Sequence, residues 1–292
     1  MGKSSASEGS AVGIDLGTTF SSLARVDSAG HVEVIPNREG HSTTASVVFF
    51  DGDTVLVGRE AQKEALLHPE KAAECFKRDM GGARYSRKVC GAYKRPEALS
   101  AFVLRKLKED AEEKVGPITD AVITVPSYFD DGRRKATQDA GRVAGLNVID
   151  IINEPTAAAI WYGYSKQNGP EDRCFLVYDL GGGTFDATLM QVNGKSDFRT
   201  IATDGDVRLG GRDWDERVLE YVAEKFKDET GNDPREDGMS YQELSMHVEE
   251  AKRSLSSRPR TTIPVSHAGR RLGVSLSREK FHELTADLLN RT

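Results

Sequence analysis

Two segments of the chain repeat one short pattern, and this repeat constrains the fold more than any other feature of the sequence. The segments AVGIDLGTTF (residues 11–20) and LVYDLGGGTF (residues 176–185) each carry an apolar run, then Asp-Leu-Gly, then threonine and phenylalanine. An apolar run that ends in glycine is typical of a buried strand entering a tight turn. A repeat of this kind indicates an internal duplication, so we expect two related lobes.

The elements expected around the repeats mix strands with helices. Residues 11–57 predict antiparallel strands joined by turns at 28–30 and 51–53, and helical signals begin at Arg59. Alternation of strand and helix after residue 97 predicts a parallel part of the sheet, so the fold class is α/β with mixed sheets flanked by helices. The sequence predicts helices over 97–115, 133–144, from Pro155, 213–227, 241–255 and 278–290, and strands over 121–125, 148–152, 174–180, after 184, near Ile263 and near Leu272.

The length of 292 residues suits about two domains. We assign residues 1–10 to a disordered tail, 11–172 to the first lobe and 173–292 to the second lobe. Within the second lobe, residues 213–292 are expected to form a part of their own, made of helices and strands.

Composition excludes several classes of function. Lys and Arg number 40 against 46 Asp and Glu, and this net charge of -6 argues against nucleic acid as the partner. Apolar runs all fall short of the roughly 18 residues that a membrane helix needs, so no membrane association is expected. Cys75, Cys90 and Cys174 lack the spacing of a disulfide framework or zinc site, which favours reduced thiols and a cytoplasmic protein.

Each repeated turn has the composition of a phosphate-binding loop. Glycine exposes backbone N–H groups and lets an anion approach closely, and the neighbouring threonines add hydroxyl donors. Asp15 and Asp179 close the two apolar runs, where carboxylates suit a hydrated magnesium ion. A single Asp-Leu-Gly turn is more often an ordinary hairpin, but two matched copies predict a polyphosphate held between two lobes.

Five motifs together resemble the ATPase domain of the seventy-kilodalton heat-shock chaperones of the DnaK type. They are GIDLGTTFSS, VITVPSYFDDGRRKAT, IINEPTAAA, YDLGGGTFD and EEAKRSLSS, in this order along the chain. HPEKAAECFKRDMGG and VLRKLKEDAEE resemble the compact HscC-type branch most closely. The resemblance implies the actin-like (ribonuclease H-like) ATPase fold with two duplicated lobes. It also implies that the second lobe is truncated and that no peptide-binding domain is present.

The resemblance implies a site for ATP or ADP with Mg²⁺. Asp15 and Asp179 match the carboxylates around magnesium, and Glu154 matches a carboxylate near the attacking water and the metal. Lys77 matches the lysine that reaches the γ-phosphate, and Asp186 matches an acid close to potassium sites. The residues that match the nucleotide-binding loops are Gly17, Thr18, Thr19, Phe20, Gly181, Gly182, Gly183, Thr184, Gly210 and Gly211. Lys77, Glu154, Asp179, Thr184 and Asp15 form the implied catalytic set.

Without the resemblance, several of these residues have simpler explanations. Lys77 would be a solvated surface lysine, and Glu154 before Pro155 would be an acid that favours the start of a helix. Glu249, Lys252, Arg253 and Ser256 would form a charged stripe on an exposed helix, whereas the resemblance assigns these four to adenosine binding. Pro126 would simply end a strand, whereas the resemblance makes Pro126 and Arg134 a relay between nucleotide and substrate domains.

The implied function is ATP hydrolysis that controls a peptide-binding domain in protein folding, in a monomer that acts on unfolded client polypeptides. Nucleotide-exchange factors and J-domain co-chaperones are the implied partners. Asp150 stands where the family commonly carries arginine at the J-domain contact, and this charge reversal weakens the expectation of that partner. Arg212 stands where an acid is usual, without an assigned role. A small-molecule kinase and an actin-like filament protein are the alternatives on the same fold.

Overall fold

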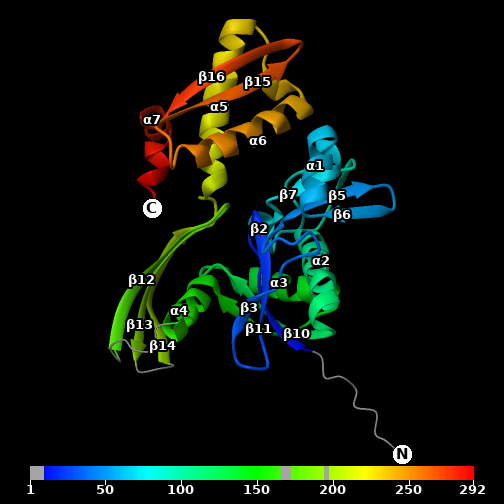
Figure 1. Cartoon of the computed structure of the whole chain (residues 1–292), viewed down its shortest axis with the longest axis vertical. Coiled ribbons are helices and arrows are strands. Elements are labelled where there is room, and N and C mark those ends of the chain that lie inside the picture. Colours follow the sequence, from blue (N-terminus) through cyan, green and yellow to red (C-terminus); the bar gives the residue numbers. More distant parts are fainter. Residues whose placement is uncertain (1–9, 166–171, 194–196) are drawn as a thin grey trace, which may run out of the picture.

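The computed structural model describes residues 10–165, 172–193 and 197–292. The first lobe lies to the right in Figure 1, and a second sheet, β12–β14, lies at the lower left. Helices α5–α7 and the β15–β16 hairpin stand above that second sheet. The predicted tail falls on residues 1–9, which lie outside the described residues, and on Ser10, which pairs with Ile118 as the first residue of β1.

The first lobe is built on a mixed sheet with the strand order β11–β10–β1–β2–β3, and β4 pairs with β2. Strands β1, β10 and β11 are parallel neighbours, whereas β2 is antiparallel to both β1 and β3. The bounds are β1 Ser10–Asp15, β2 Phe20–Val26, β3 Val32–Val34, β4 Thr44–Ala45, β10 Ile118–Val125 and β11 Asn147–Asn153. The predicted combination of an antiparallel meander with a parallel part is confirmed.

Helices cover this sheet where the sequence places an apolar stripe. In α2 (Pro96–Val115), Leu99, Val103 and Leu107 are at most 5% exposed and belong to the core of the first lobe. Helix α3 (Asp131–Val143) packs against α2 and begins at Asp130, whose side chain accepts a hydrogen bond from the Arg133 amide. Helix α4 (Glu154–Ser165) follows β11 directly.

A smaller part of the first lobe carries the segment with Lys77. The predicted hairpin is present as β5 (Val47–Asp51) and β6 (Thr54–Val57), and α1 (Arg59–Leu67) lies against it. Five short elements follow that the sequence pattern does not predict. They are the 3₁₀ helix η1 Pro69–Lys71, β7 Ala72–Glu74, which pairs with β5, the 3₁₀ helix η2 Phe76–Asp79, β8 Lys88–Val89 and β9 Ala92–Tyr93.

The second lobe opens with a sheet of three strands. Strand β12 (Asp172–Leu180) is antiparallel to β13 (Phe185–Asn193), and β13 is antiparallel to β14 (Asp197–Asp206). Only β12 and β13 are predicted from the sequence. Strand β14 was missed because its sequence DFRTIATDGD is polar and largely exposed, and so lacks the alternation of a half-buried strand.

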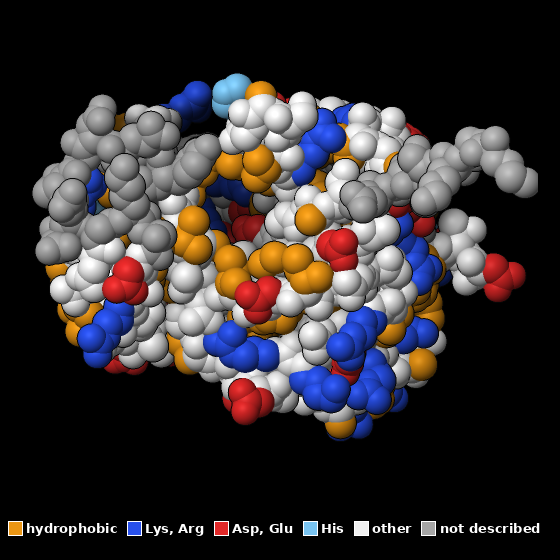
Figure 2. Space-filling model, turned by 90° about the horizontal axis from the view of Figure 1, so that it is seen from below, with side chains coloured by type: hydrophobic (Ala, Val, Ile, Leu, Met, Phe, Trp, Pro, Cys, Tyr) orange, Lys and Arg blue, Asp and Glu red, His pale blue; other side chains and the backbone are white. Residues whose placement is uncertain are grey.

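The two sheets differ at the duplicated strand. Strand β1 has neighbours on both sides, whereas in the described part of the chain β12 pairs only with β13. Leu176 and Tyr178 of β12 are 60% and 49% exposed. β1 is also half-buried rather than fully buried as expected, since Val12 and Ile14 are in the core while Gly13 and Asp15 are exposed. Figure 2 shows apolar side chains around a hollow on the lower face of the molecule.

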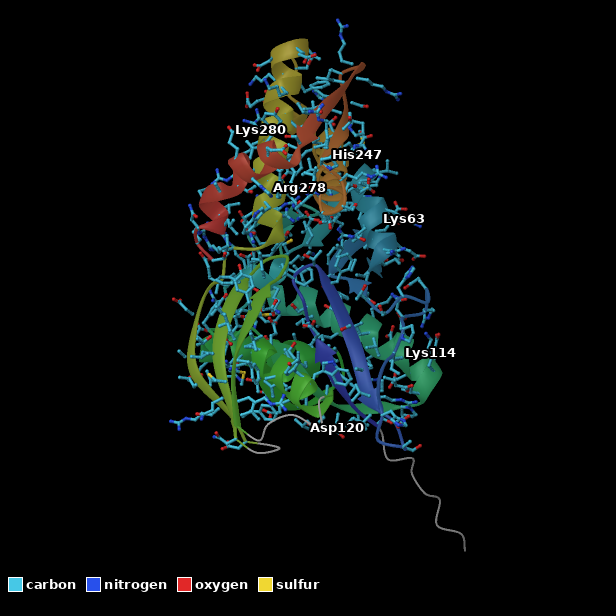
Figure 3. The ribbon with its side chains drawn as sticks, turned by 60° about the vertical axis from the view of Figure 1, so that its left-hand side comes forward. Lys63, Lys114, Asp120, His247, Arg278 and Lys280 are labelled. Atoms are coloured by element: carbon cyan, nitrogen blue, oxygen red, sulfur yellow. The ribbon has the colours of Figure 1, made fainter. Side chains whose placement is uncertain are left out.

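The upper part of the second lobe has its own core. Val222, Phe226, Val248, Ile263 and Leu276 are fully buried in it. Figure 3 shows Arg278 at the junction of these elements, where its guanidinium donates to backbone carbonyl groups that follow α6. The elements are α5 Gly211–Thr230, the 3₁₀ helix η3 Pro234–Glu236, α6 Gly238–Ser254, β15 Arg260–His267, β16 Arg270–Ser277 and α7 Arg278–Leu289. Among the described residues, no helix has both the length and the apolar character needed to span a bilayer.

Candidate nucleotide site

The first glycine loop joins β1 to β2 and is held by a serine from another segment. A Cβ atom on Gly17 would lie 2.0 Å from the carbonyl oxygen of Phe20, so the turn requires glycine here. Ser46 Oγ donates to the Gly17 carbonyl oxygen over 2.8 Å, and the Ser46 amide donates to the Thr19 carbonyl oxygen over 2.8 Å. Ser46 therefore fixes the first glycine loop through two hydrogen bonds.

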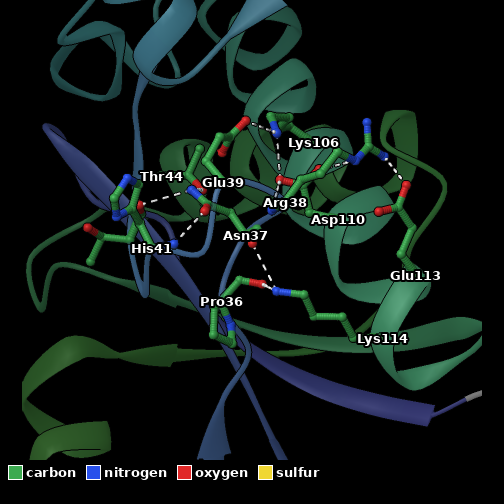
Figure 4. Close-up of polar contacts among 11 residues, drawn as sticks. Pro36, Asn37, Arg38, Glu39, His41, Thr44, Lys106, Asp110, Glu113 and Lys114 are labelled. Carbon is green, nitrogen blue, oxygen red and sulfur yellow. Dashed lines mark hydrogen bonds and ion pairs between the residues drawn. The ribbon is translucent and has the colours of Figure 1, made fainter.

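The segment that carries Ser46 is tied to α2 by a polar network (Figure 4). Lys106 Nζ lies 2.6 Å from a carboxylate oxygen of Asp110, which is 1% exposed. Arg38 pairs with Glu113, and Lys114 Nζ donates to the Asn37 carbonyl oxygen over 2.9 Å. These contacts hold the chain between β3 and β4, and β4 leads directly into Ser46.

The second glycine loop joins β12 to β13 and supports the start of α5. The Gly181 amide donates to the Thr184 carbonyl oxygen over 3.0 Å, and Gly211 donates to the Gly181 carbonyl oxygen over 2.9 Å. A Cβ atom on Gly210 would lie 2.5 Å from the Gly183 amide nitrogen. The structure thus packs the predicted glycines of residues 181–183 against those of residues 210–211.

The two loops touch each other across the boundary between the lobes. A Cβ atom on Gly182 would lie 1.9 Å from Thr19 Oγ1, and one on Gly183 would lie 2.5 Å from Thr18 Cγ2. Among the described turns and loops, no backbone hydrogen bond uses the amide N–H groups of Thr18, Thr19, Gly182 or Gly183. Unused amides of this kind, grouped in two glycine loops, suit an anion such as phosphate.

Four predicted catalytic side chains surround these loops. Lys77 comes from η2 and is 5% exposed at its side chain, and its Nζ lies 2.6 Å from Glu154 Oε1, at the start of α4. Asp15 ends β1 and accepts a hydrogen bond from Thr124 Oγ1 over 3.1 Å, while Asp179 lies near the end of β12. Lys77 is therefore a buried, ion-paired lysine and not a solvated surface residue.

Burial and neighbouring carboxylates raise the pKa of Glu154 and of Asp179. Burial raises the pKa of Glu154, the Lys77 ammonium opposes that effect, and Asp15 and Asp179 add to it. Burial and the charge of Asp15 likewise raise the pKa of Asp179. The charges of the three carboxylates Asp15, Glu154 and Asp179 thus exceed that of Lys77, which is the electrostatic setting that fits a divalent ion. In the described residues no three acidic, His or Cys side chains converge to hold a metal directly, so a magnesium ion would keep much of its water.

Asp186 lies opposite Asp179 on β13 and is almost fully buried. Its Oδ2 atom accepts a hydrogen bond from the Ser127 amide over 3.3 Å, whereas Oδ1 has no hydrogen-bond partner among the described residues. Burial, with the charges of Glu154 and Asp179, raises its pKa to about 7. A buried carboxylate with an unpartnered oxygen fits the predicted potassium site, which stays a prediction.

The predicted relay residues lie where the two lobes meet. Pro126 follows β10, and the next residue, Ser127, contacts Asp186 of β13. Tyr128 Oη donates to the Phe185 carbonyl oxygen over 2.5 Å. Arg134 holds this segment from α3, since its guanidinium donates to carbonyl oxygens of residues 127 and 129. The contacts of Ser127 and Tyr128 with the second lobe are not predicted from the sequence, because neither residue type indicates a partner that is distant in the chain.

The predicted adenosine residues are only partly brought together. Arg253 reaches across to the first lobe, where its guanidinium lies 5.9 Å from the ring centroid of Phe20, and it also pairs with Glu249. Lys252 Nζ points instead at the start of α5, where it donates to the Gly211 carbonyl oxygen over 2.8 Å. Ser256 lies beyond the last residue of α6.

Fold and site define a two-lobed α/β protein with an internal duplication and a pair of facing glycine loops. A family model described as Hsp70 protein matches residues 11–94 and 83–292. The chain therefore belongs to the Hsp70 family, whose members have an actin-like fold with a nucleotide-binding ATPase domain of the chaperone type. The assignment to the compact HscC-type branch stays a prediction.

Proposed function

We propose that this chain binds Mg-ATP between its two glycine loops and hydrolyses it to ADP and phosphate. The observation that carries the proposal is the contact between Thr18 and Gly183, which places unused amides of both lobes beside one another. A polyphosphate bound there would join the two lobes. Nucleotide state would then set the angle between them, and this would control a peptide-binding domain and its unfolded clients.

The protein's own groups contribute position and charge to this reaction. Lys77 is held by Glu154 in a buried position. A buried cation stabilises developing negative charge far better than a cation at the surface does. Thr18 and Thr184, residues that are each 7% exposed, would add hydroxyl donors beside the loop amides. Asp15 and Asp179 would hold a magnesium ion mainly through water. When bound there, magnesium would supply positive charge that neutralises the phosphates.

Coupling to another domain is proposed to run through the segment after β10. Arg134 fixes the segment that contains Pro126, and Ser127 and Tyr128 of that segment contact β13. A change in lobe angle would therefore move this segment. Asp150 is exposed on β11, the edge strand of the first sheet. Its negative charge would repel an acidic J-domain partner and so weaken that pairing.

Titration calorimetry with Mg-ADP and Mg-ATP tests the proposed site. In Gly183→Ala the new methyl group would lie 2.5 Å from Thr18 Cγ2, and we expect the affinity to fall at least about tenfold. Gly13→Ala is the matched control, because its Cβ atom would have no neighbour closer than 4.0 Å. Equal affinities in the two variants would contradict the site.

Phosphate release separates this function from the alternatives on the same fold. A chaperone-type ATPase releases phosphate from ATP with no added acceptor, whereas an obligatory small-molecule kinase does not. A filament protein would sediment when nucleotide is added.

A further inference from the structure

Arg212 belongs to a pair of reciprocal ion pairs between the two lobes. The segment 74–78 of the first lobe contributes Glu74 and Arg78, and the first turn of α5 contributes Arg212 and Asp213. Arg212 Nη2 lies 3.2 Å from Glu74 Oε1, and Arg78 Nη2 lies 2.5 Å from Asp213 Oδ2. Each lobe therefore gives one cation and one anion to the contact.

The side chains of this contact are only partly exposed. Arg212 and Glu74 are 33% and 22% exposed, and Arg78 and Asp213 are 18% and 26% exposed. Arg212 Nη1 also donates to Cys75 Sγ over 2.9 Å. Cys75 has a φ angle of 56°, in the left-handed region that residues other than glycine rarely adopt. Glu74 and Cys75 together thus receive the Arg212 guanidinium.

Both ends of this contact are connected to the proposed site. On the second lobe, the Arg212 amide donates to the Gly182 carbonyl oxygen over 3.0 Å, so its backbone is fixed to the second glycine loop. On the first lobe, Lys77 lies between Glu74 and Arg78 in the chain. Arg78 Nε donates to the Gly183 carbonyl oxygen over 2.8 Å. The four ion-paired side chains therefore fix the Lys77 segment against the second glycine loop.

We propose that Arg212 is a positioning residue, whose ion pair with Glu74 holds the Lys77 segment on the second glycine loop and slows the release of bound nucleotide. The proposal rests on the nucleotide-binding function above. An acid at position 212 would replace this attraction with a second negative charge on the side of α5 that faces Glu74, so Arg212 and Glu74 are matched to each other in charge.

Charge reversal and its rescue test this role better than removal of one side chain. Glu74 also lies 3.5 Å from Arg87 Nη1, so Arg212→Ala would leave it with a second cation. The variants are Arg212→Glu, Glu74→Arg and the double exchange of both residues. Arg217→Glu is the control, because Arg217 is also on α5 but pairs with Asp287 on an exposed face within the second lobe.

The measurement is the stopped-flow release of a fluorescent ADP derivative, with magnesium present, from the whole chain. We expect each single reversal to speed release about tenfold, the size expected when an attraction becomes a repulsion. The double exchange should return release to within about threefold of the original rate, and Arg217→Glu should leave it unchanged. Single and double variants that release at equal rates would overturn the proposal.

Hydrogen exchange of the nucleotide-free protein gives a second readout. Peptides that cover residues 74–80 and 209–215 should exchange faster in Arg212→Glu and regain protection in the double exchange. If the original chain fails to bind the ADP probe, the nucleotide-binding function is wrong, while these peptides still test the ion pair. If exchange is the same in all variants, the positioning role is wrong even where the chain binds ADP.

Discussion

We predict that the buried carboxyl of Asp186 makes the stability of the protein fall as pH rises from about 4 to about 7, and that Asp186→Asn removes that loss. Burial raises the pKa of Asp186 from its ordinary 3.8 to about 7. Between these two values the folded chain keeps a proton that the unfolded chain has lost, so raising the pH favours unfolding. Above pH 7 both states are ionised, and this source of pH dependence ends.

The size of the effect follows from the pKa. Each pH unit between the two pKa values changes the free energy of unfolding by about 1.36 kcal/mol. From pH 5 to pH 8 the relevant window is the two units up to about pH 7, so Asp186 should cost about 3 kcal/mol. Asparagine keeps the shape and an oxygen for the Ser127 amide, but it does not ionise. The gain in free energy of unfolding from Asp186→Asn should thus be about 3 kcal/mol larger at pH 8 than at pH 5.

Urea unfolding at both pH values measures this difference. Tryptophan fluorescence is a suitable probe, because Trp214 packs in the same buried cluster as Phe185, next to Asp186. The protein should be free of nucleotide and magnesium, and the buffer should contain no potassium. Added potassium should reduce the difference if it binds the carboxylate as predicted. An Asp186→Asn gain that is equal at pH 5 and pH 8 would refute the reasoning.

Three further substitutions test other parts of the structure. Ser46→Ala removes the donor to the Gly17 carbonyl oxygen and should lower both the stability, by about 1–2 kcal/mol in urea unfolding, and the affinity for ATP. Gly141→Ala should cost about 1–2 kcal/mol because its methyl group would lie 2.3 Å from Val148 Cγ2, and Val148→Ala should restore part of that loss. Any self-association seen in light scattering should fall in Leu176→Lys, since this 60% exposed leucine lies on a strand that has one partner strand in the described part of the chain.

The following results would contradict these three predictions. A Ser46 variant with unchanged ATP affinity would show that the first glycine loop needs no support from that side. A Gly141 variant that gains stability would show that helix propensity outweighs the crowding. Leu176→Lys with unchanged scattering would show that self-association does not use β12.

Local patterns in the sequence predicted most of the fold. The stripe of Leu99, Val103 and Leu107 predicted α2, and the two Asp-Leu-Gly turns predicted the positions of both glycine loops. Strand β14 was missed because its pairing with β13 depends on a partner strand and leaves no apolar alternation of its own. The duplication also suggested more symmetry than the described residues show, since among them β1 is paired on both sides and β12 on one.

The residues of the site were predicted, but the contacts between them were not. The family resemblance indicated Lys77 and Glu154 as separate candidates, and only the fold brings Nζ and Oε1 to 2.6 Å. Arg212 had no assigned role because its partner Glu74 lies far away in the chain. Contacts between the lobes depend on how the two lobes pack against each other. The spacing of residues within either lobe therefore does not predict them.

Single-turnover hydrolysis by Lys77→Met tests the central claim most directly. Methionine keeps the apolar stem in a site where the side chain is 5% exposed, but it removes the charge that would stabilise the γ-phosphate. We predict that the rate constant for phosphate release falls about a hundredfold, while the ATP dissociation constant from calorimetry changes less than about threefold. Full turnover in the variant would contradict the role of Lys77. Failure of the original chain to bind Mg-ATP would contradict the proposed function as a whole.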